Sequence, residues 1–145
     1  MIEQLSVFLQ NEPGRLADLC RALGNAGVNM RALMVADTQE FGVVRIICDH
    51  PRTAKDALET AGFGVSVTGV IAVEVPDTPG GLADVLEALG VEGINVEYAY
   101  CFVEPGTSGA AVDVLKVDDE RGHGVLEAAG YRVLRPADLY EPDGA

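Results

Sequence analysis

The chain has 145 residues, of which 48% are apolar, and its 10 basic and 23 acidic residues give a formal net charge of −13. This is globular composition, and the length fits one domain or two small ones. The negative charge argues against binding to nucleic acid, which needs Lys and Arg, and against binding to anionic membranes. With no membrane-length apolar run and no signal-peptide pattern at the N-terminus, we expect a cytoplasmic protein.

The first half of the chain predicts the element order β-α-β-β-α-β. Leu5, Val7 and Leu9 alternate with polar residues, which indicates a half-buried strand. The next apolar residues follow helical spacing, and Pro13 suits the first turn of a helix because its missing N–H needs no partner there. The expected elements are a strand at 5–9, a helix at 16–23, strands at 29–36 and 43–48, a helix at 54–61 and a strand at 63–67.

The second half of the chain repeats this pattern. Residues 79–95, PGGLADVLEALGVEGIN, match residues 13–29, PGRLADLCRALGNAGVN, at 10 of 17 positions without a gap. Such a repeat indicates two copies of one structural unit. The expected elements are strands at 71–75, 95–103 and 110–117, helices at 82–89 and 122–129, and a closing strand at 131–134. We predict domains at 1–68 and 69–135 and a C-terminal tail at 136–145.

The repeated order predicts an α+β protein of two ferredoxin-like βαββαβ units, with antiparallel sheets and helices packed on one face. The strand at 63–67 runs into the strand at 71–75 through Thr68 and Gly69. Units of this size leave edge strands and a sheet face uncovered, so we expect the copies to dock and the protein to form a homodimer. Leu139 and Tyr140 can dock, whereas we expect the end of the tail after them to be mobile.

The turn after the first strand of each copy has features of an α-amino acid site. It reads NEPGRL in the first copy and DTPGGL in the second, and a helix begins there. Free N–H groups and the helix dipole attract a carboxylate. Asn11 and Asp77 add acceptors that suit an ammonium group, and Asn29 and Asn95 can donate and accept hydrogen bonds. The same residues also make good turns and helix caps without a ligand, so both interpretations stay open.

Each copy resembles the ACT domain in the order of its parts: a strand, the motif D/N-x-P-G-x-L, a helix, the motif G-x-x-G-V/I-N and a β-hairpin. This order occurs twice within about residues 2–135. ACT domains are regulatory modules that usually bind amino acids at interfaces between two such domains. The resemblance implies a site between the first turn of one copy and the second strand of the other. The residues that it implies are Asn11, Glu12, Pro13, Gly14, Arg15, Leu16, Asn29 and Met30, and Asp77, Thr78, Pro79, Gly80, Gly81, Leu82, Asn95 and Val96.

The two predicted sites are not equivalent. After Pro-Gly the first copy has Arg15, which can clamp a carboxylate, block a ligand or lie exposed on the helix, whereas the second has Gly81, which permits close backbone approach. Tyr98 and Tyr100 share one face of a strand. They can line a pocket for an apolar or aromatic side chain, and we include Tyr98 in the site, although such pairs also pack interfaces.

The sequence offers no catalytic residue, metal site or cofactor site. Cys20, Cys48 and Cys101 have no C-x-x-C spacing and fall in or beside apolar patterns, so we expect small buried side chains. The serines lack a G-x-S-x-G context, and His50 and His123 are isolated. We expect the strand acids Glu74, Glu97 and Asp113 to be outward-facing charges on an exposed sheet.

We therefore predict a non-catalytic regulatory module that binds a free amino acid at ACT–ACT interfaces. Most ACT domains are attached to the enzyme or transcription factor that they regulate, and we expect no such attachment here. We then expect any regulated partner to be a separate enzyme or transcription factor, with no nucleic acid or membrane involved; the other interpretation is that the protein binds and buffers its ligand. The alternative is a ligand-free module for protein–protein interaction or assembly.

Overall fold

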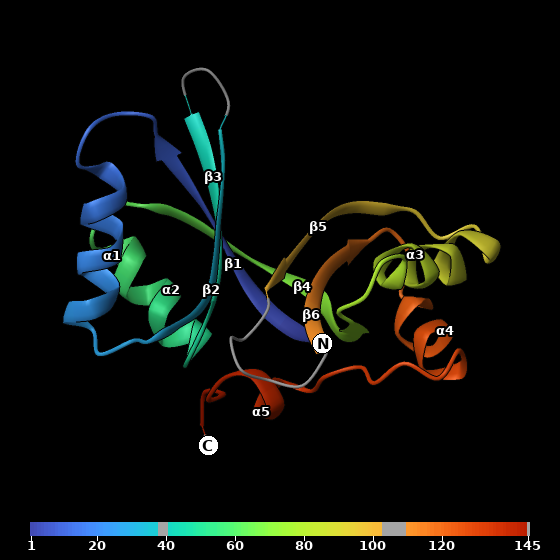
Figure 1. Cartoon of the computed structure of the whole chain (residues 1–145). Helices are drawn as coiled ribbons and strands as arrows, with labels where there is room; N and C mark the ends of the chain where they lie inside the picture. The colour runs from blue at the N-terminus through green and yellow to red at the C-terminus, as the bar shows by residue number, and fades with distance from the viewer. Residues whose placement is uncertain (38–40, 103–109, 145) are drawn as a thin grey trace. The chain divides into compact units, whose positions relative to one another are not determined.

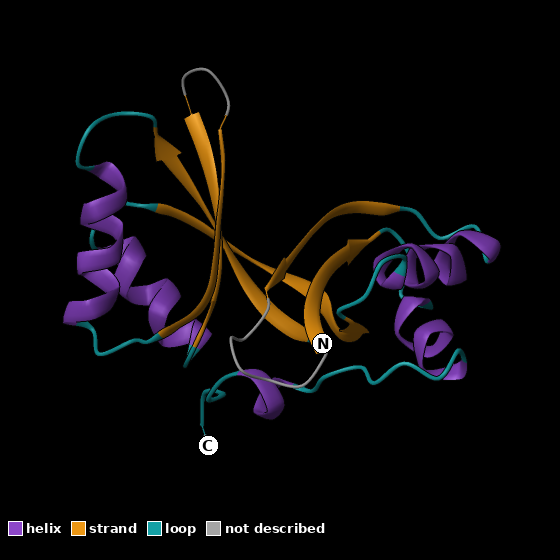
Figure 2. Ribbon diagram, viewed as in Figure 1, coloured by secondary structure: helices purple, strands orange, loops and turns teal. Residues whose placement is uncertain are grey.

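The computed structural model describes residues 1–37, 41–102 and 110–144. Figure 1 labels its elements and Figure 2 colours them by type. In chain order they are β1 (Ile2–Gln10), α1 (Arg15–Asn25), β2 (Met30–Asp37), β3 (Phe41–Cys48), α2 (Pro51–Thr60), β4 (Gly64–Pro76), α3 (Gly81–Val91), β5 (Val96–Phe102), β6 (Ala110–Val117), α4 (Gly122–Ala128) and α5 (Pro136–Leu139). The predicted α+β class with two βαββαβ units is confirmed.

The strands follow the order β2-β3-β1-β4-β6-β5 in one six-stranded sheet. The pairs β1–β3, β2–β3, β4–β6 and β5–β6 are antiparallel. The closing strand of the first repeat and the opening strand of the second form the single continuous strand β4, as their direct connection predicts. The chain forms two compact units, which we call the first unit (Glu3–Thr68 with Pro136–Ala145) and the second unit (Met1–Ile2 with Gly69–Arg135).

The core of the first unit lies between its strands and the helices α1 and α2, which cover one face of those strands (Figures 1 and 2). In β1 and β3, apolar residues at every second position point toward the helices and pack against their apolar stripes. The buried residues of this core include Leu5, Val7, Leu9, Leu19, Leu23, Val44, Ile46, Ala54, Leu58 and Phe63.

The core of the second unit repeats this arrangement with Ile71, Val73, Val85, Leu89 and Leu126. The predicted closing strand at 131–134 is reduced to an isolated bridge between Val73 and Val133. The segment is short, and Pro136, which has no N–H for a sheet ladder, begins α5 directly after it.

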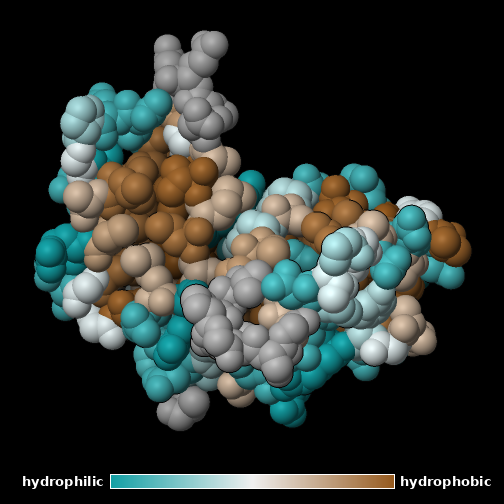
Figure 3. All heavy atoms as spheres, viewed as in Figure 1, coloured by the Kyte–Doolittle hydropathy of each residue, from teal (hydrophilic) through white to brown (hydrophobic). Residues whose placement is uncertain are grey.

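The first unit exposes apolar side chains on the face that carries its helices. Leu16 of α1 is 37% exposed, and Leu33 and Val35 of β2 are 43% and 46% exposed. In Figure 3 brown residues gather between α1 and the β2–β3 hairpin. We call these three residues the apolar surface of the first unit. No helix among the described residues is long and apolar enough to cross a bilayer.

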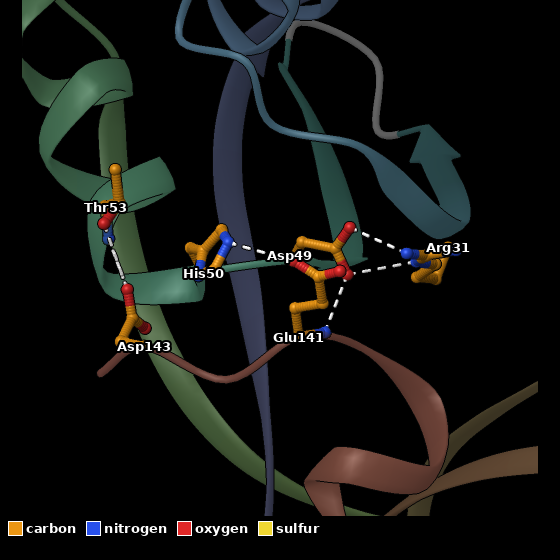
Figure 4. A network of polar contacts seen from close by, with 6 residues as sticks. All are labelled: Arg31, Asp49, His50, Thr53, Glu141 and Asp143. Atoms are coloured by element: carbon orange, nitrogen blue, oxygen red, sulfur yellow. Dashed lines mark hydrogen bonds and ion pairs between the residues drawn. The ribbon is translucent and has the colours of Figure 1, made fainter. Parts of the chain in front are cut away.

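The C-terminal tail packs on the first unit. Tyr140 is buried, and its hydroxyl accepts a hydrogen bond from the Glu3 N–H at 3.1 Å. The Glu141 N–H donates to the Asp49 carboxylate at 2.7 Å, and the Thr53 N–H donates to the Asp143 carboxylate at 3.2 Å (Figure 4). The Arg52 N–H also donates to the Asp143 carboxylate, at 2.8 Å. Mobility was expected after Tyr140, but these bonds fix Glu141 and Asp143.

Candidate functional site

The predicted turns lie at the strand-to-helix connections of the two units. Gly14 and Gly80 precede α1 and α3 with φ angles of 87° and 83°, a left-handed conformation that glycine adopts without strain. No side chain among the described residues caps either helix N-terminus. Because the first N–H groups of a helix have no partner within it, both starts can accept a carboxylate.

A small pocket opens beside the turn of the first unit. Its volume is about 120 Å³, and it brings together the predicted residues Asn11, Glu12 and Leu16. Leu9, Gln10, Val35 and Gly42 complete its lining. The pocket is smaller than the roughly 300 Å³ typical of small-molecule sites, so it can enclose only part of an amino acid. Its walls combine aliphatic side chains with the polar groups of the turn.

Arg15 packs against its own unit and is not among the residues that line this pocket. Its guanidinium lies 4.7 Å from the centre of the Phe63 ring, within the range of a cation–π contact. It also donates a hydrogen bond to Asp18 at 3.4 Å. The sequence left open a carboxylate clamp, a block to the ligand or an exposed arginine; the contacts observed instead pack Arg15 against its own unit at the start of α1.

The turn of the second unit has a tighter backbone. A Cβ atom at Gly81 would lie 2.2 Å from the Pro76 carbonyl oxygen and 3.5 Å from a methyl carbon of Val75. No side chain fits there, although the repeat has arginine at this position in the first unit. The two turns are therefore structurally different, in addition to carrying different residues.

Asp113 is a buried acid, whereas the strand pattern predicted an outward-facing charge, and that prediction is wrong. It is 2% exposed, and its Oδ1 atom has no hydrogen-bond partner among the described residues. Burial raises the pKa of its carboxyl, and a hydrogen bond with the Cys101 thiol partly opposes this rise. Glu74 and Glu97, in contrast, form ion pairs with Arg132 and Lys116 at 2.6 and 3.0 Å.

The register of the sheet explains the burial of Asp113. It lies opposite Val73 on β4 and Cys101 on β5. Directly opposed residues share a face, so Asp113 lies on the face of the core residues Val73 and Leu115. Cys101 was expected to be buried, as Cys48 is, but it is exposed because β5 is an outer strand. Burial raises the pKa of the Cys101 thiol, and the nearby charges of Asp113 and Asp77 add to this rise.

A signal for Asp113 is present in the repeat. The β3 and β6 strands are each followed by an aspartate, and counting back five residues from Asp49 and Asp118 gives Val44 and Asp113. An acid at a position where the other copy has a buried valine marks a polar group in the core. The signal emerges only when each strand acid is compared with its counterpart in the other copy.

The predicted asparagines lie away from the turns of their own units. The Asn29 carbonyl accepts from the Asp49 N–H, and the Asn95 carbonyl accepts from the Asp118 N–H, where β2 and β5 begin. The turns lie near the other ends of these strands, since Gln10 at the end of β1 pairs with Phe41. Met30 and Val96 begin the strands, and Tyr98 lies opposite Lys116, on the face away from Leu115. The expectation that these residues join a turn of another ACT unit stays a prediction.

No group of three His, Cys, Asp or Glu residues in the described parts of the chain could hold a metal ion. The side chains brought together at the turns are instead aliphatic groups, amides and carboxylates, with uncapped helix N–H groups beside them. Such a set can bind a small zwitterion through hydrogen bonds and charge.

Comparison with known proteins gives matches along almost the whole chain. The model of the family described as "ACT domain pair" matches residues 1–131. The crystal structure of protein BT0572 from Bacteroides thetaiotaomicron is 34% identical, with a TM-score of 0.88 over 94% of each chain. The ligand-free regulatory subunit of aspartate kinase from Thermus thermophilus is 18% identical, with a TM-score of 0.68 over 88% of this chain and 90% of that one. No curated protein matches significantly.

Proposed function

The chain belongs to the family of paired ACT domains, and on this premise we propose that it is a non-catalytic regulatory module that binds a free amino acid where ACT units meet. In this proposal it acts in the cytoplasm as a homodimer, without a cofactor, and signals to a separate enzyme or transcription factor. The regulatory subunits of aspartate kinase, which share its fold, are a precedent for a regulatory chain that serves an enzyme.

The observation that carries the proposal is the pair of strand-to-helix turns. Both helices begin at a left-handed glycine without a side-chain cap, so backbone N–H groups can receive a carboxylate. The pocket beside the first turn adds Asn11 and Glu12 as acceptors for an ammonium group, and Leu16 and Val35 as contacts for a side chain. The second turn offers Asp77 in the position of Asn11.

The alternative is a ligand-free module for protein interaction or assembly. The apolar surface of the first unit favours it, because Leu16, Leu33 and Val35 are all more than a third exposed. Exposed apolar patches often mark protein interfaces. Leu16 and Val35 also line the pocket, so the same surface fits a site that is completed by a second ACT unit.

A thermal-shift screen against the twenty amino acids at millimolar concentration tests the proposal. A ligand that binds only the folded state adds about 2.7 kcal/mol of stability when its free concentration is a hundred times its Kd, and it therefore raises the melting temperature. We expect a shift with one or a few amino acids that is reduced in Asn11→Ala and Asp77→Ala. Asp56→Ala, an exposed aspartate on α2, is the control and should respond as wild type does. No shift with any amino acid would favour the assembly module.

A further inference from the structure

The sheet of the second unit differs from that of the first at two paired positions. In the first unit Val44 lies opposite Val35, which lines the pocket beside the turn. In the second unit the corresponding pair is Asp113 opposite Cys101. The core-side face of the strands is thus aliphatic at this pair in the first unit, whereas it carries a carboxyl and a thiol in the second.

Asp113 lies within reach of the second turn. Cys101 pairs with Asp113 across the sheet, and Asp113 lies three positions along β6 from Ala110, which pairs with Pro76 at the end of β4, directly before the turn. The charge of Asp77 adds to the rise in the pKa of the Cys101 thiol, which agrees with this placement. Cys101 is exposed and Asp113 is buried beside it. A group that approaches the turn over Cys101 therefore comes near the unpartnered Oδ1 of Asp113.

The described residues compensate this carboxyl only through the hydrogen bond with the Cys101 thiol. Its Oδ1 has no hydrogen-bond donor among them, and none of their basic side chains contributes to the pKa of the carboxyl. A buried carboxyl oxygen without a donor is costly, and a donor that reaches Oδ1 relieves that cost. An aliphatic group in the same place would leave the oxygen without a partner.

We propose that Asp113 makes the second unit selective for amino acids whose side chain donates a hydrogen bond through an ammonium, amide or hydroxyl group. The first unit, with Val44 and Val35 in these places, then accepts aliphatic side chains. The two units of one chain therefore bind different classes of amino acid. This inference rests on the proposed function and assigns Asp113 as a specificity-determining residue of it.

Calorimetric titration of the full chain with matched amino acids tests the inference. The pairs are threonine with valine, asparagine with leucine, and lysine with norleucine, each differing chiefly in a side-chain donor. For at least one pair we expect the donor-bearing member to bind about 10- to 100-fold more tightly, the range of a hydrogen bond to a charged group. Asp113→Val, which removes both oxygens, should reduce this preference to less than about twofold, and Asp113→Asn, which keeps an acceptor without the charge, should reduce it in part.

Glu97→Gln is the matched control, since it removes one acid from β5 of the same unit and should keep the preference of the wild type. Melting curves without ligand confirm that each variant is folded, and Asp113→Val should melt no lower than wild type because it removes a buried carboxyl whose Oδ1 has no partner among the described residues. If the wild type binds amino acids but the Asp113 variants keep its affinity ratios, the inference is wrong and the proposed function stands. If no amino acid binds, the proposed function fails and the inference fails with it.

Discussion

Gly81 illustrates how one residue separates two similar turns. Its backbone is not in the left-handed region, so alanine meets no conformational penalty there. The obstacle is the Pro76 carbonyl oxygen, 2.2 Å from where a Cβ atom would lie. Backbone atoms cannot move aside as the end of a flexible side chain can. The second turn must shift to accept any side chain, whereas the first accepts Arg15.

Gly81→Ala should lower the free energy of unfolding by about 1 to 3 kcal/mol, the usual cost of overpacking. Gly90→Ala, on the same helix, is the control, because a Cβ atom there would meet open space among the described residues. It should raise stability by up to about 1 kcal/mol, since alanine favours helix. Urea denaturation of both variants measures the difference. Equal stability of the two variants would contradict the close contact at Gly81.

At the scale of elements, the tail connects α5 to the start of α2 and the end of β3. The Asp143 carboxylate supplies the cap that α2 otherwise lacks, since His50 at the N-cap makes no side-chain cap bond. The Arg31 guanidinium donates two hydrogen bonds to Asp49, at 3.1 and 2.8 Å, and the tail donates a third from Glu141 (Figure 4). The tail is thus part of the first unit's structure.

Asp143→Ala should lower the free energy of unfolding by about 1 kcal/mol, as the loss of a helix cap does, whereas Asp143→Asn should lose much less because asparagine also caps well. Chemical denaturation of the two variants distinguishes a cap from a general charge effect. Equal losses in both variants would show that charge, not capping, connects the tail to α2.

Asp49 should make the first unit sensitive to acid. Hydrogen bonds from Arg31 hold the pKa of its carboxyl below the ordinary value, against the opposing effect of burial. A lowered pKa contributes stability that is complete above the unfolded value of about 3.9 and is lost as pH falls through the folded value. The stability advantage of wild type over Asp49→Asn should therefore be constant near pH 6 and shrink below about pH 4. Denaturation of both proteins across this range measures it, and an advantage that grows in acid would contradict it.

At the scale of the whole molecule, a net charge of −13 coexists with exposed apolar side chains. Such charge favours solubility by repulsion between copies. The apolar surface of the first unit offers the opposing attraction, because Leu33 and Val35 share one face of β2 and Val35 lines the same pocket as Leu16. A homodimer, which we propose, would cover it, and added salt should then strengthen the association by screening the charge.

Leu33→Glu should shift the protein toward monomer in sedimentation velocity by placing a charge in the apolar surface. Val91→Glu, which changes an 84% exposed residue at the end of α3, introduces the same charge and should leave the oligomeric state of the wild type unchanged. A wild type that sediments as a monomer at all concentrations would contradict the dimer.

The sequence by itself determined the two-copy βαββαβ plan. Apolar periodicity and the Pro-Gly turns are local signals, and their repetition at a constant offset makes them more specific, so the helices, the continuous strand β4 and both turns were predictable. It also located Asn11, Glu12 and Leu16, which the structure joins in one pocket. The closing segment at 131–134 was predicted to be a full strand, but it forms only one bridge with Val73. Strand pairing depends on which segment lies beside a strand, and the local pattern does not contain that information.

Only the tertiary structure decided which polar groups are buried and what they contact. In the sequence Asp113 looks like any acid in an alternating strand pattern, but the register of the sheet places it on the core face, opposite Val73. Asp49 and Glu141 lie 92 positions apart, and the close fit of Pro76 on Gly81 depends on backbone packing. Residue types and spacing encode local periodicity, whereas burial and contact between distant residues are set by how the elements pack, which no local pattern contains.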